Sequence, residues 1–354
     1  MTEDDQLSTG TITKIEAVAC MVHDGERSYR CAARDRLLES DTAQSNPLAV
    51  GDRVKFRVLD EDAAEGVVED VLPRESKLSR APPHDSRREK VIVANVDRLL
   101  IVTSVRQPPL NLSIIDRYLI AAARGGVTPA LCINKIDLAD DEDEYARVVD
   151  IYREEGLDVA TTSAETGAGM EGLKELLKDT TTVFAGHSGV GKSSLLNRLQ
   201  PDLDLRTGQL SPGGKGKHCT STTSLLRLDF GAYVVDTPGI REFTLWDLEK
   251  REVPRYFPGI LELSHDCRMP DCTHTHEPDC AVKEAVEKGE YPEDRYDSYC
   301  RILETVEQPE VPRKTDVERP DEQVPQEKRE KKRQRRRDSV QEMIEEELER
   351  WHNE

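Results

Sequence analysis

The sequence lacks any long, uninterrupted run of hydrophobic residues. Its most apolar stretch, KVIVANVDRLLIVTSV, is broken by Asp97 and Arg98, and the first ten residues, MTEDDQLSTG, are acidic. A membrane-spanning helix needs about 20 mainly apolar residues, and a secretory signal needs an apolar core. We therefore expect no membrane span and no signal peptide, and we expect a cytoplasmic protein.

Positive charge is also in short supply. The 50 Lys and Arg residues are outnumbered by 70 Asp and Glu residues, which gives a net charge of −20 at pH 7. Such a surface repels phosphate, which argues against a protein that coats nucleic acid indiscriminately. The exception is the cationic segment EKREKKRQRRRDS near the C-terminus, which either contacts RNA or is simply solvated. Contacts with nucleic acid must therefore come from local patches.

Cysteine is sparse and unevenly placed. Of the 8 cysteines in 354 residues, three lie close together between residues 267 and 280. Clustering of this kind, in a chain with no expected signal peptide, favours a metal site over a disulfide framework. We interpret the scattered Cys20, Cys31, Cys132 and Cys300 as packing residues.

The N-terminal part of the chain is predicted to form a small β-barrel. Several short strand patterns, separated by turn-rich stretches such as HDGE and SNPLAVGD, fill residues 10–73 after a disordered tail at 1–9. An SH3-like or merely structural barrel is the alternative to a ligand-binding one, because a fold does not specify its ligand. A polar connection that contains prolines, residues 74–90, follows.

The rest of the chain divides into three predicted parts. Strand and helix patterns alternate over residues 91–250, which is typical of a parallel sheet covered on both faces. Residues 251–305 hold the cysteine cluster and a helical stretch, CAVKEAVEKGE. Residues 306–354 are charged and flexible, with the end SVQEMIEEELERWHN able to form one amphipathic helix.

The segment GHSGVGKS matches the phosphate-binding pattern GxxxxGK[ST], and it follows an apolar strand and precedes a helix. Its glycines let backbone N–H groups turn towards phosphates, Lys192 neutralises the β and γ oxygens, and Ser193 places its hydroxyl on Mg²⁺. The residues expected to line this cradle are Gly186, Ser188, Gly189, Val190, Gly191, Lys192, Ser193 and Ser194.

The phosphate loop binds any nucleoside triphosphate, and the motif NKID decides between ATP and GTP. Asp137 can accept two hydrogen bonds from guanine, Asn134 meets the base edge, and the stem of Lys135 packs on the ring. Adenine lacks this donor pair and would leave the carboxylate unpaired, at a cost of about 1–3 kcal/mol. Alone, NKID is also a common turn after a strand. TSAETG supports guanine, because Ser163, Ala164 and Glu165 can offer backbone donors to the guanine oxygen.

Two further motifs complete a GTP site. DTPG follows the strand AYVV, so Asp236 is expected to face Mg²⁺ through water and the Gly239 N–H to sense a γ-phosphate, although DTPG is also a good turn sequence. The intervening stretch GGKGKHCTSTTS is rich in Gly and Thr. Thr220, in preference to Thr222, is expected to bind Mg²⁺ when GTP is present. A simply solvated loop is the alternative.

The order of the motifs is unusual, because the base selector precedes the phosphate loop. It is the order of a GTPase sheet cut after DTPG and rejoined elsewhere. Over residues 10–305 the chain resembles the circularly permuted, ribosome small subunit-dependent GTPases of the RsgA or YjeQ family, notably in GHSGVGKSSLLN, GKHCT, DTPGIREF and CRMPDCTHTHEPDCAV. The resemblance implies an N-terminal RNA-binding OB-fold barrel, a permuted α/β P-loop GTPase domain and a small C-terminal α-helical zinc domain. It also implies hydrolysis of GTP to GDP and phosphate, stimulated by the small (30S) ribosomal subunit late in its maturation.

The resemblance assigns further roles. His218 matches the candidate water-orienting residue, with an exposed loop histidine as the alternative. Ile240 stands where Ras-like GTPases have a glutamine, so slow intrinsic turnover is expected. Gly189 replaces the asparagine of potassium-dependent GTPases, and Cys219 stands where threonine is common, which leaves Thr220 as the matching hydroxyl. The residues expected to act in hydrolysis are His218, Thr220 and Lys192.

The cysteine cluster offers three thiolates and one imidazole, from Cys267, Cys272, His274 and Cys280. This set is enough for a tetrahedral structural Zn²⁺ with no open position for catalysis. His276 and His265 are competing imidazoles, and free thiols are the alternative.

The expected cofactors are Mg²⁺ and one structural Zn²⁺, with GTP as substrate and GDP as product. The expected partners of this monomer are the small ribosomal subunit and its rRNA, with other assembly factors beside them. Two other functions stay open: a GTPase that acts on tRNA, and a GTP-gated RNA-binding protein with negligible hydrolysis, which Ile240 keeps in view.

Overall fold

The computed structural model describes most of the chain, and its described residues belong to one compact unit that spans Met1–Glu307. The described residues are 7–16, 19–34, 37, 46–80, 89–203, 223–236 and 248–306. His218, Thr220, Gly239 and the tail after residue 306 lie outside them. Within the described part, no helix is long and apolar enough to cross a membrane.

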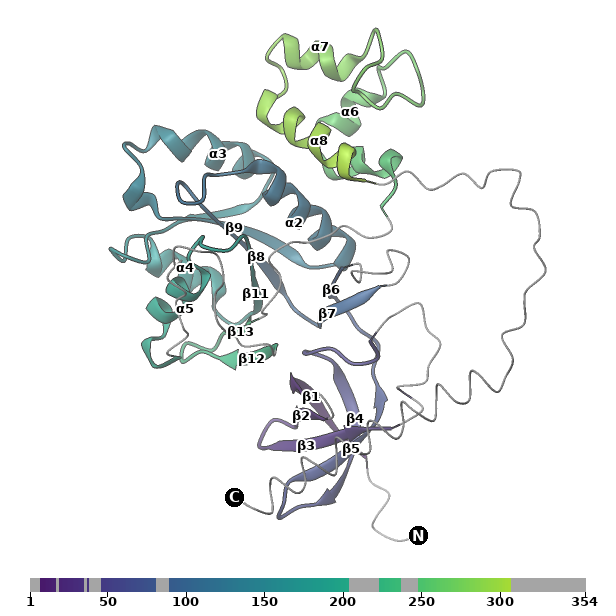
Figure 1. Cartoon of the computed structure of the whole chain (residues 1–354), viewed down its shortest axis with the longest axis vertical. Coiled ribbons are helices and arrows are strands. Elements are labelled where there is room, and N and C mark those ends of the chain that lie inside the picture. The colour runs from purple at the N-terminus through teal and green to yellow at the C-terminus, as the bar shows by residue number, and fades with distance from the viewer. Residues whose placement is uncertain are drawn as a thin grey trace, which may run out of the picture. The chain divides into compact units, whose positions relative to one another are not determined.

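The N-terminal strands form a closed barrel, drawn in purple and blue in Figure 1. Its strands are β1 (Ser8–Ile15), β2 (Cys20–His23), β3 (Ser28–Ala33), β4 (Arg53–Asp60) and β5 (Glu65–Val71). They follow the order β1-β2-β3-β5-β4, and pairing of β4 with β1 closes the ring. Along β4, Val54 and Phe56 are buried while Arg53 and Lys55 are exposed, which is the period of two expected when one face lines a core.

The predicted connection contains a strand that the sequence pattern did not reveal. β6 (Lys77–Arg80) pairs antiparallel with β7 (Lys90–Ala94), and Leu78 of β6 is fully buried against the core of the following domain. The polar residues around Leu78 conceal this strand in the sequence, because only one side chain of the four is buried.

The central domain is built on a six-strand portion of the sheet, in the order β10-β9-β8-β11-β13-β12. Its strands are β8 (Arg98–Ser104), β9 (Thr128–Asn134), β10 (Asp158–Thr161), β11 (Thr181–Ala185), β12 (Ser224–Arg227) and β13 (Tyr233–Asp236). All neighbours pair in parallel except β12, which is antiparallel to β13. β8 is buried at six of its seven positions, as a parallel strand covered on both faces must be.

Helices cover both faces of this sheet, as Figure 1 shows. They are α2 (Leu112–Gly125), α3 (Asp143–Glu154), α4 (Met170–Leu177) and α5 (Lys192–Leu199), with short 3-10 turns at Ile136–Leu138 (η2) and Pro201–Leu203 (η3). One core cluster gathers α2 and α3 on one face, and a second gathers α4 and α5 on the other. The α2 helix begins at Asn111, whose side chain accepts from the Ser113 N–H, and ends at Gly126 with φ of 67°.

The C-terminal module is a small group of helices around its own core. They are η4 (Lys250–Tyr256), α6 (Ile260–Ser264), α7 (Ala281–Glu287) and α8 (Glu293–Thr305). Phe257, Tyr299 and Ile302 are fully buried in this core, together with Ile120 of α2. The sequence predicted only α7, and both α8 and η4 contact α2.

Candidate functional site

The phosphate loop joins the end of β11 to the start of α5. Gly186 has φ of 145° and Gly191 has φ of 98°, both in the region that glycine favours. An added Cβ at Gly186 would lie 2.0 Å from the carbonyl oxygen of Val102, and one at Gly191 would lie 2.4 Å from Nδ2 of Asn134. Glycine is therefore required at both ends of the loop for steric as well as conformational reasons.

The Lys192 ammonium lies against this loop and gives it a positive charge. Its Nζ donates to the carbonyl oxygens of Gly186, at 2.7 Å, and His187, at 3.0 Å. Ser193 and Ser194 occupy the first turn of α5 and are half-buried, while Ser188 is exposed at the loop tip. An anion in this cradle would meet a lysine, hydroxyls and the N–H groups of a helix start, which is a phosphate site by its chemistry.

Asn134 connects the base side of the site to the phosphate side. It ends β9 and is 1% exposed. Its Nδ2 donates to the carbonyl oxygen of Val190 in the phosphate loop at 2.8 Å, and its Oδ1 accepts from the Ala164 N–H and the Thr162 hydroxyl, each at 3.2 Å. One amide therefore ties together the phosphate loop, NKID and SAETG.

The base-selecting carboxylate is held by a serine. The Ser163 hydroxyl donates to the carboxylate of Asp137, and the N–H of Thr166 donates to the Ser163 hydroxyl oxygen at 3.0 Å. Ser163 is fully buried, whereas Asp137 is exposed. The Ser163 hydroxyl thus orients the carboxylate on its protein side, while its solvent side is open to a base. A contact in which the carboxylate accepts two hydrogen bonds from guanine requires this arrangement.

Lys135 is bent towards the loop that follows β8. It has φ of 61°, and its Nζ donates to the carbonyl oxygen of Gln107 at 2.5 Å. Burial lowers the pKa of Lys135. Sequence reasoning missed both Gln107 and Thr162. Thr162 is the first residue of TSAETG and could have been given a role, whereas a backbone carbonyl leaves no signal in a sequence.

The remaining predicted nucleotide residues are placed only in part. Asp236 ends β13, which runs parallel to β11, so its backbone and the phosphate loop share the carboxyl edge of the sheet. His218, Thr220 and Gly239 lie outside the described residues, so their roles stay predictions.

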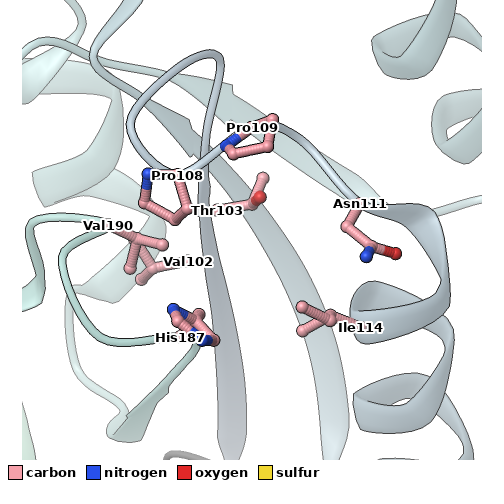
Figure 2. Close-up of a pocket in the computed structure, with 8 residues that line it drawn as sticks. All are labelled: Val102, Thr103, Pro108, Pro109, Asn111, Ile114, His187 and Val190. Carbon is pink, nitrogen blue, oxygen red and sulfur yellow. The ribbon is translucent and has the colours of Figure 1, made fainter.

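A cavity of about 200 Å³ opens beside the phosphate loop. Figure 2 shows His187 and Val190 of the loop across from Asn111 and Ile114 at the start of α2, with Pro108 next to Val190. The walls are mainly apolar, and His187 and Asn111 are among the polar groups on its rim. The start of α2 therefore borders the phosphate site.

The four predicted metal ligands come together in the C-terminal module. Cys267, Cys272, His274 and Cys280 place their ligand atoms within 4.8 Å of one another. The Nδ1 of His274 lies 3.5 Å from each of the Cys267 and Cys280 sulfurs, and those sulfurs are 3.9 Å apart. A tetrahedron with zinc bonds of about 2.1 Å to nitrogen and 2.3 Å to sulfur has edges of about 3.6 Å between nitrogen and sulfur and about 3.8 Å between two sulfurs. The donor set and its spacing therefore fit Zn²⁺.

Other groups orient this cluster. Burial lowers the pKa of His274, which favours the neutral imidazole that a metal needs. The buried Glu277 accepts from the backbone N–H groups of Thr273, at 2.9 Å, and Thr275, at 3.0 Å, on either side of His274. The competing His276 has a side chain that is 83% exposed and is not among the four clustered ligands.

The sequence matches known proteins over most of its length. The model of the RsgA GTPase family matches residues 71–246. The small ribosomal subunit biogenesis GTPase RsgA of Chlorobaculum tepidum is 39% identical over 306 residues, covering 84% of this chain and 98% of that protein. The protein of the same name from Haemophilus influenzae strain 86-028NP is 38% identical over 300 residues, covering 83% and 84%.

Two solved structures share the fold. YjeQ from Thermotoga maritima superposes with a TM-score of 0.65 at 36% identity, covering 84% of this chain and 98% of that one. YloQ, described as a circularly permuted GTPase, gives a TM-score of 0.61 at 31% identity, covering 86% and 96%. These matches confirm the expected multidomain fold with its permuted GTPase domain, as well as the resemblance on which the expectation was based.

Proposed function

Because this chain belongs to the RsgA GTPase family, we propose that it binds the small ribosomal subunit late in its maturation and hydrolyses GTP to GDP and phosphate there. The relatives that cover most of its length are named small ribosomal subunit biogenesis GTPases. The observation that carries the proposal is the hydrogen bond from Asn134 to Val190, which joins a guanine-selecting motif to a phosphate loop in one site.

The proposal gives each predicted nucleotide residue a role. Asp137, oriented by Ser163, selects guanine, and Lys192 neutralises the β- and γ-phosphates. Ser193 and Thr220 would hold Mg²⁺, which would add to this charge neutralisation. His218 orients the attacking water in this proposal.

Slow turnover in the absence of the ribosome is part of the proposal. Ile240 stands where a Ras-like enzyme has its water-orienting glutamine, so the subunit is expected to complete the active centre. The protein acts in the cytoplasm as a monomer, alongside other assembly factors. Its domains are the barrel at 10–73, the GTPase domain at 91–250 and the zinc domain at 251–305.

Recognition of rRNA by the barrel and the zinc domain completes the proposal. Two cations of the barrel are paired with an acidic residue. Arg34 lies 2.8 Å and Arg57 lies 3.4 Å from the buried carboxylate of Glu69. Such pairing fixes the guanidinium groups in place but reduces their net field. RNA affinity should accordingly depend on shape and on a few contacts more than on bulk charge.

Co-sedimentation tests the proposed partner directly. The full-length protein is centrifuged with purified small subunits, large subunits or tRNA, in the presence of GDP or a non-hydrolysable GTP analogue. We expect it to pellet with small subunits in the analogue and to be released in GDP. Equal pelleting with large subunits, or binding to tRNA alone, would overturn the assignment.

A further inference from the structure

One buried cation of the C-terminal module is held by two carboxylates of the GTPase domain. Arg295 of α8 has a side chain that is 1% exposed and pairs with Asp116 of α2. Its Nε and Nη2 also donate to the two carboxylate oxygens of Glu155, at 2.9 and 2.8 Å. The guanidinium carbon lies 5.1 Å from the ring centroid of Tyr152 and 4.9 Å from that of Phe257. The arginine therefore joins three helical segments in one contact.

Asp116 is equally enclosed. It is 2% exposed and accepts from the Tyr152 hydroxyl at 2.8 Å as well as from Arg295 and the Ser298 hydroxyl. A buried charge is stable only while its partners are present, and removal of one partner leaves the other uncompensated. These polar contacts therefore hold α8 on α2 in one orientation, which apolar packing alone does not guarantee.

The same turns of α8 hold the zinc loop. The Tyr296 hydroxyl donates to the carbonyl oxygen of His274 at 2.7 Å, and the Tyr299 hydroxyl donates to that of Thr273 at 3.0 Å. Arg295 and Ser298 thus face the GTPase domain, while Tyr296 and the hydroxyl of Tyr299 reach the metal-binding loop. One helix is shared between the zinc site and the GTPase domain.

The other end of this connection borders the phosphate loop. Asp116 lies five residues after Asn111, or about 7.5 Å along the axis of α2. Asn111 and Ile114 line the cavity that His187 and Val190 of the phosphate loop also line, as Figure 2 shows. A short rigid segment of α2 therefore separates the buried arginine from the nucleotide site.

We propose that Arg295 is a positioning residue that couples the zinc module to the nucleotide site. Because it fixes α8 to α2, metal binding by the zinc loop stabilises the start of α2, which borders the phosphate loop. Arg295 is not one of the four clustered metal ligands and is not part of a nucleotide-binding motif. The coupling concerns the protein alone, and only its use during ribosome-stimulated hydrolysis rests on the function proposed above.

Hydrogen exchange of the full-length protein tests the coupling without a ribosome. In the wild type, chelation of zinc should speed exchange of the amides in the first two turns of α2 at least about tenfold, because α8 loses its hold. In Arg295→Met these amides should already exchange quickly, and chelation should change them little. Arg301→Met, at an exposed position of the same helix, is the matched control and should behave as the wild type does.

Hydrolysis separates positioning from general structural damage. In Arg295→Met, small-subunit-stimulated turnover should fall at least about tenfold while intrinsic turnover and GTP affinity stay near wild-type values, and Arg295→Lys should recover part of the loss. If Arg295→Met does not fold, Ser298→Ala and Arg295→Lys provide the same comparison with milder damage.

The outcomes are distinguishable. If wild-type α2 exchange does not respond to chelation, or Arg295→Met keeps the full wild-type response, the coupling is wrong. If small subunits fail to stimulate the wild type while exchange behaves as expected, the proposed function is wrong and the coupling stands.

Discussion

The side-chain amide of Asn134 donates a hydrogen bond to the backbone carbonyl of Val190 at 2.8 Å, across 56 positions of sequence. This contact joins the base selector and the phosphate loop in one site, although the base selector comes first in the permuted sequence. Because Asn134 is 1% exposed, its loss leaves buried polar groups unpaired.

Asn134→Ala should therefore weaken GTP binding by about 1–3 kcal/mol, or roughly 5- to 150-fold. Titration with a fluorescent GTP analogue measures the change. Asn197→Ala in α5 serves as the control, because Asn197 is partly buried but is not one of the predicted nucleotide contacts. Wild-type affinity in Asn134→Ala would show that this bond does not assemble the site.

Gly191→Ala should abolish measurable nucleotide binding. Its φ of 98° costs an alanine about 1–3 kcal/mol, and the new Cβ would stand 2.4 Å from Nδ2 of Asn134. Gly172→Ala in α4, where an added Cβ meets nothing within 4 Å, should leave binding intact and stabilise the helix by up to about 1 kcal/mol. Calorimetric titration and thermal unfolding distinguish the two, and equal binding by both variants would refute the steric argument.

Asp137→Asn should change the base preference of the site from guanine to xanthine. The amide donates where the carboxylate accepted, so it suits the xanthine oxygen and leaves the guanine amine unpaired. GTP affinity should fall at least about tenfold while XTP affinity rises. Asp141→Asn, an exposed neighbour, serves as the control. Unchanged GTP affinity in Asp137→Asn is the outcome that the base-selector assignment cannot survive.

Cys272→Ser should remove bound zinc while GTP binding persists. Cys272 is one of the four clustered ligands, whereas Cys300 lies in the same module outside that cluster. Metal analysis should find one zinc per chain in the wild type and in Cys300→Ser, and none retained by Cys272→Ser after dialysis. Limited proteolysis should then cut the C-terminal module of Cys272→Ser first. A wild-type protein without zinc would contradict the assignment.

His218→Ala tests the one hydrolytic role that rests on resemblance alone. Subunit-stimulated turnover should fall at least about tenfold, because water orientation acts in the transition state, while GTP affinity changes little. Single-turnover hydrolysis with saturating small subunits measures it. His265→Ala is the control, and an equal rate in His218→Ala would make this histidine a bystander.

The sequence predicted best what depends on local chemistry. The phosphate loop, NKID and the zinc ligands are short patterns in which each residue has its own reason to be present, so the fold class and the clustered ligands could be inferred before any coordinates. The alternation of strands and helices over residues 91–250 was also clear, because a strand buried on both faces leaves an apolar run and a helix buried on one face leaves a periodic pattern.

What sequence reasoning missed depends on distant partners. Helix α8 follows Pro292 without a side-chain cap, and its polar residues obscure the apolar face. Arg295 looked like any surface arginine until the fold brought it to Asp116, 179 positions away. The carbonyl of Gln107 that receives Lys135 belongs to the backbone and could not be read from residue types.

Hydrolysis by the purified full-length protein is the most direct test of the central claim. GTP turnover is measured for the protein alone and with small subunits, large subunits or bulk tRNA. We expect only small subunits to raise the rate by at least about tenfold, which corresponds to a barrier lower by about 1.4 kcal/mol or more. A protein that binds GTP well but is accelerated by none of them, or equally by tRNA, would contradict the claim.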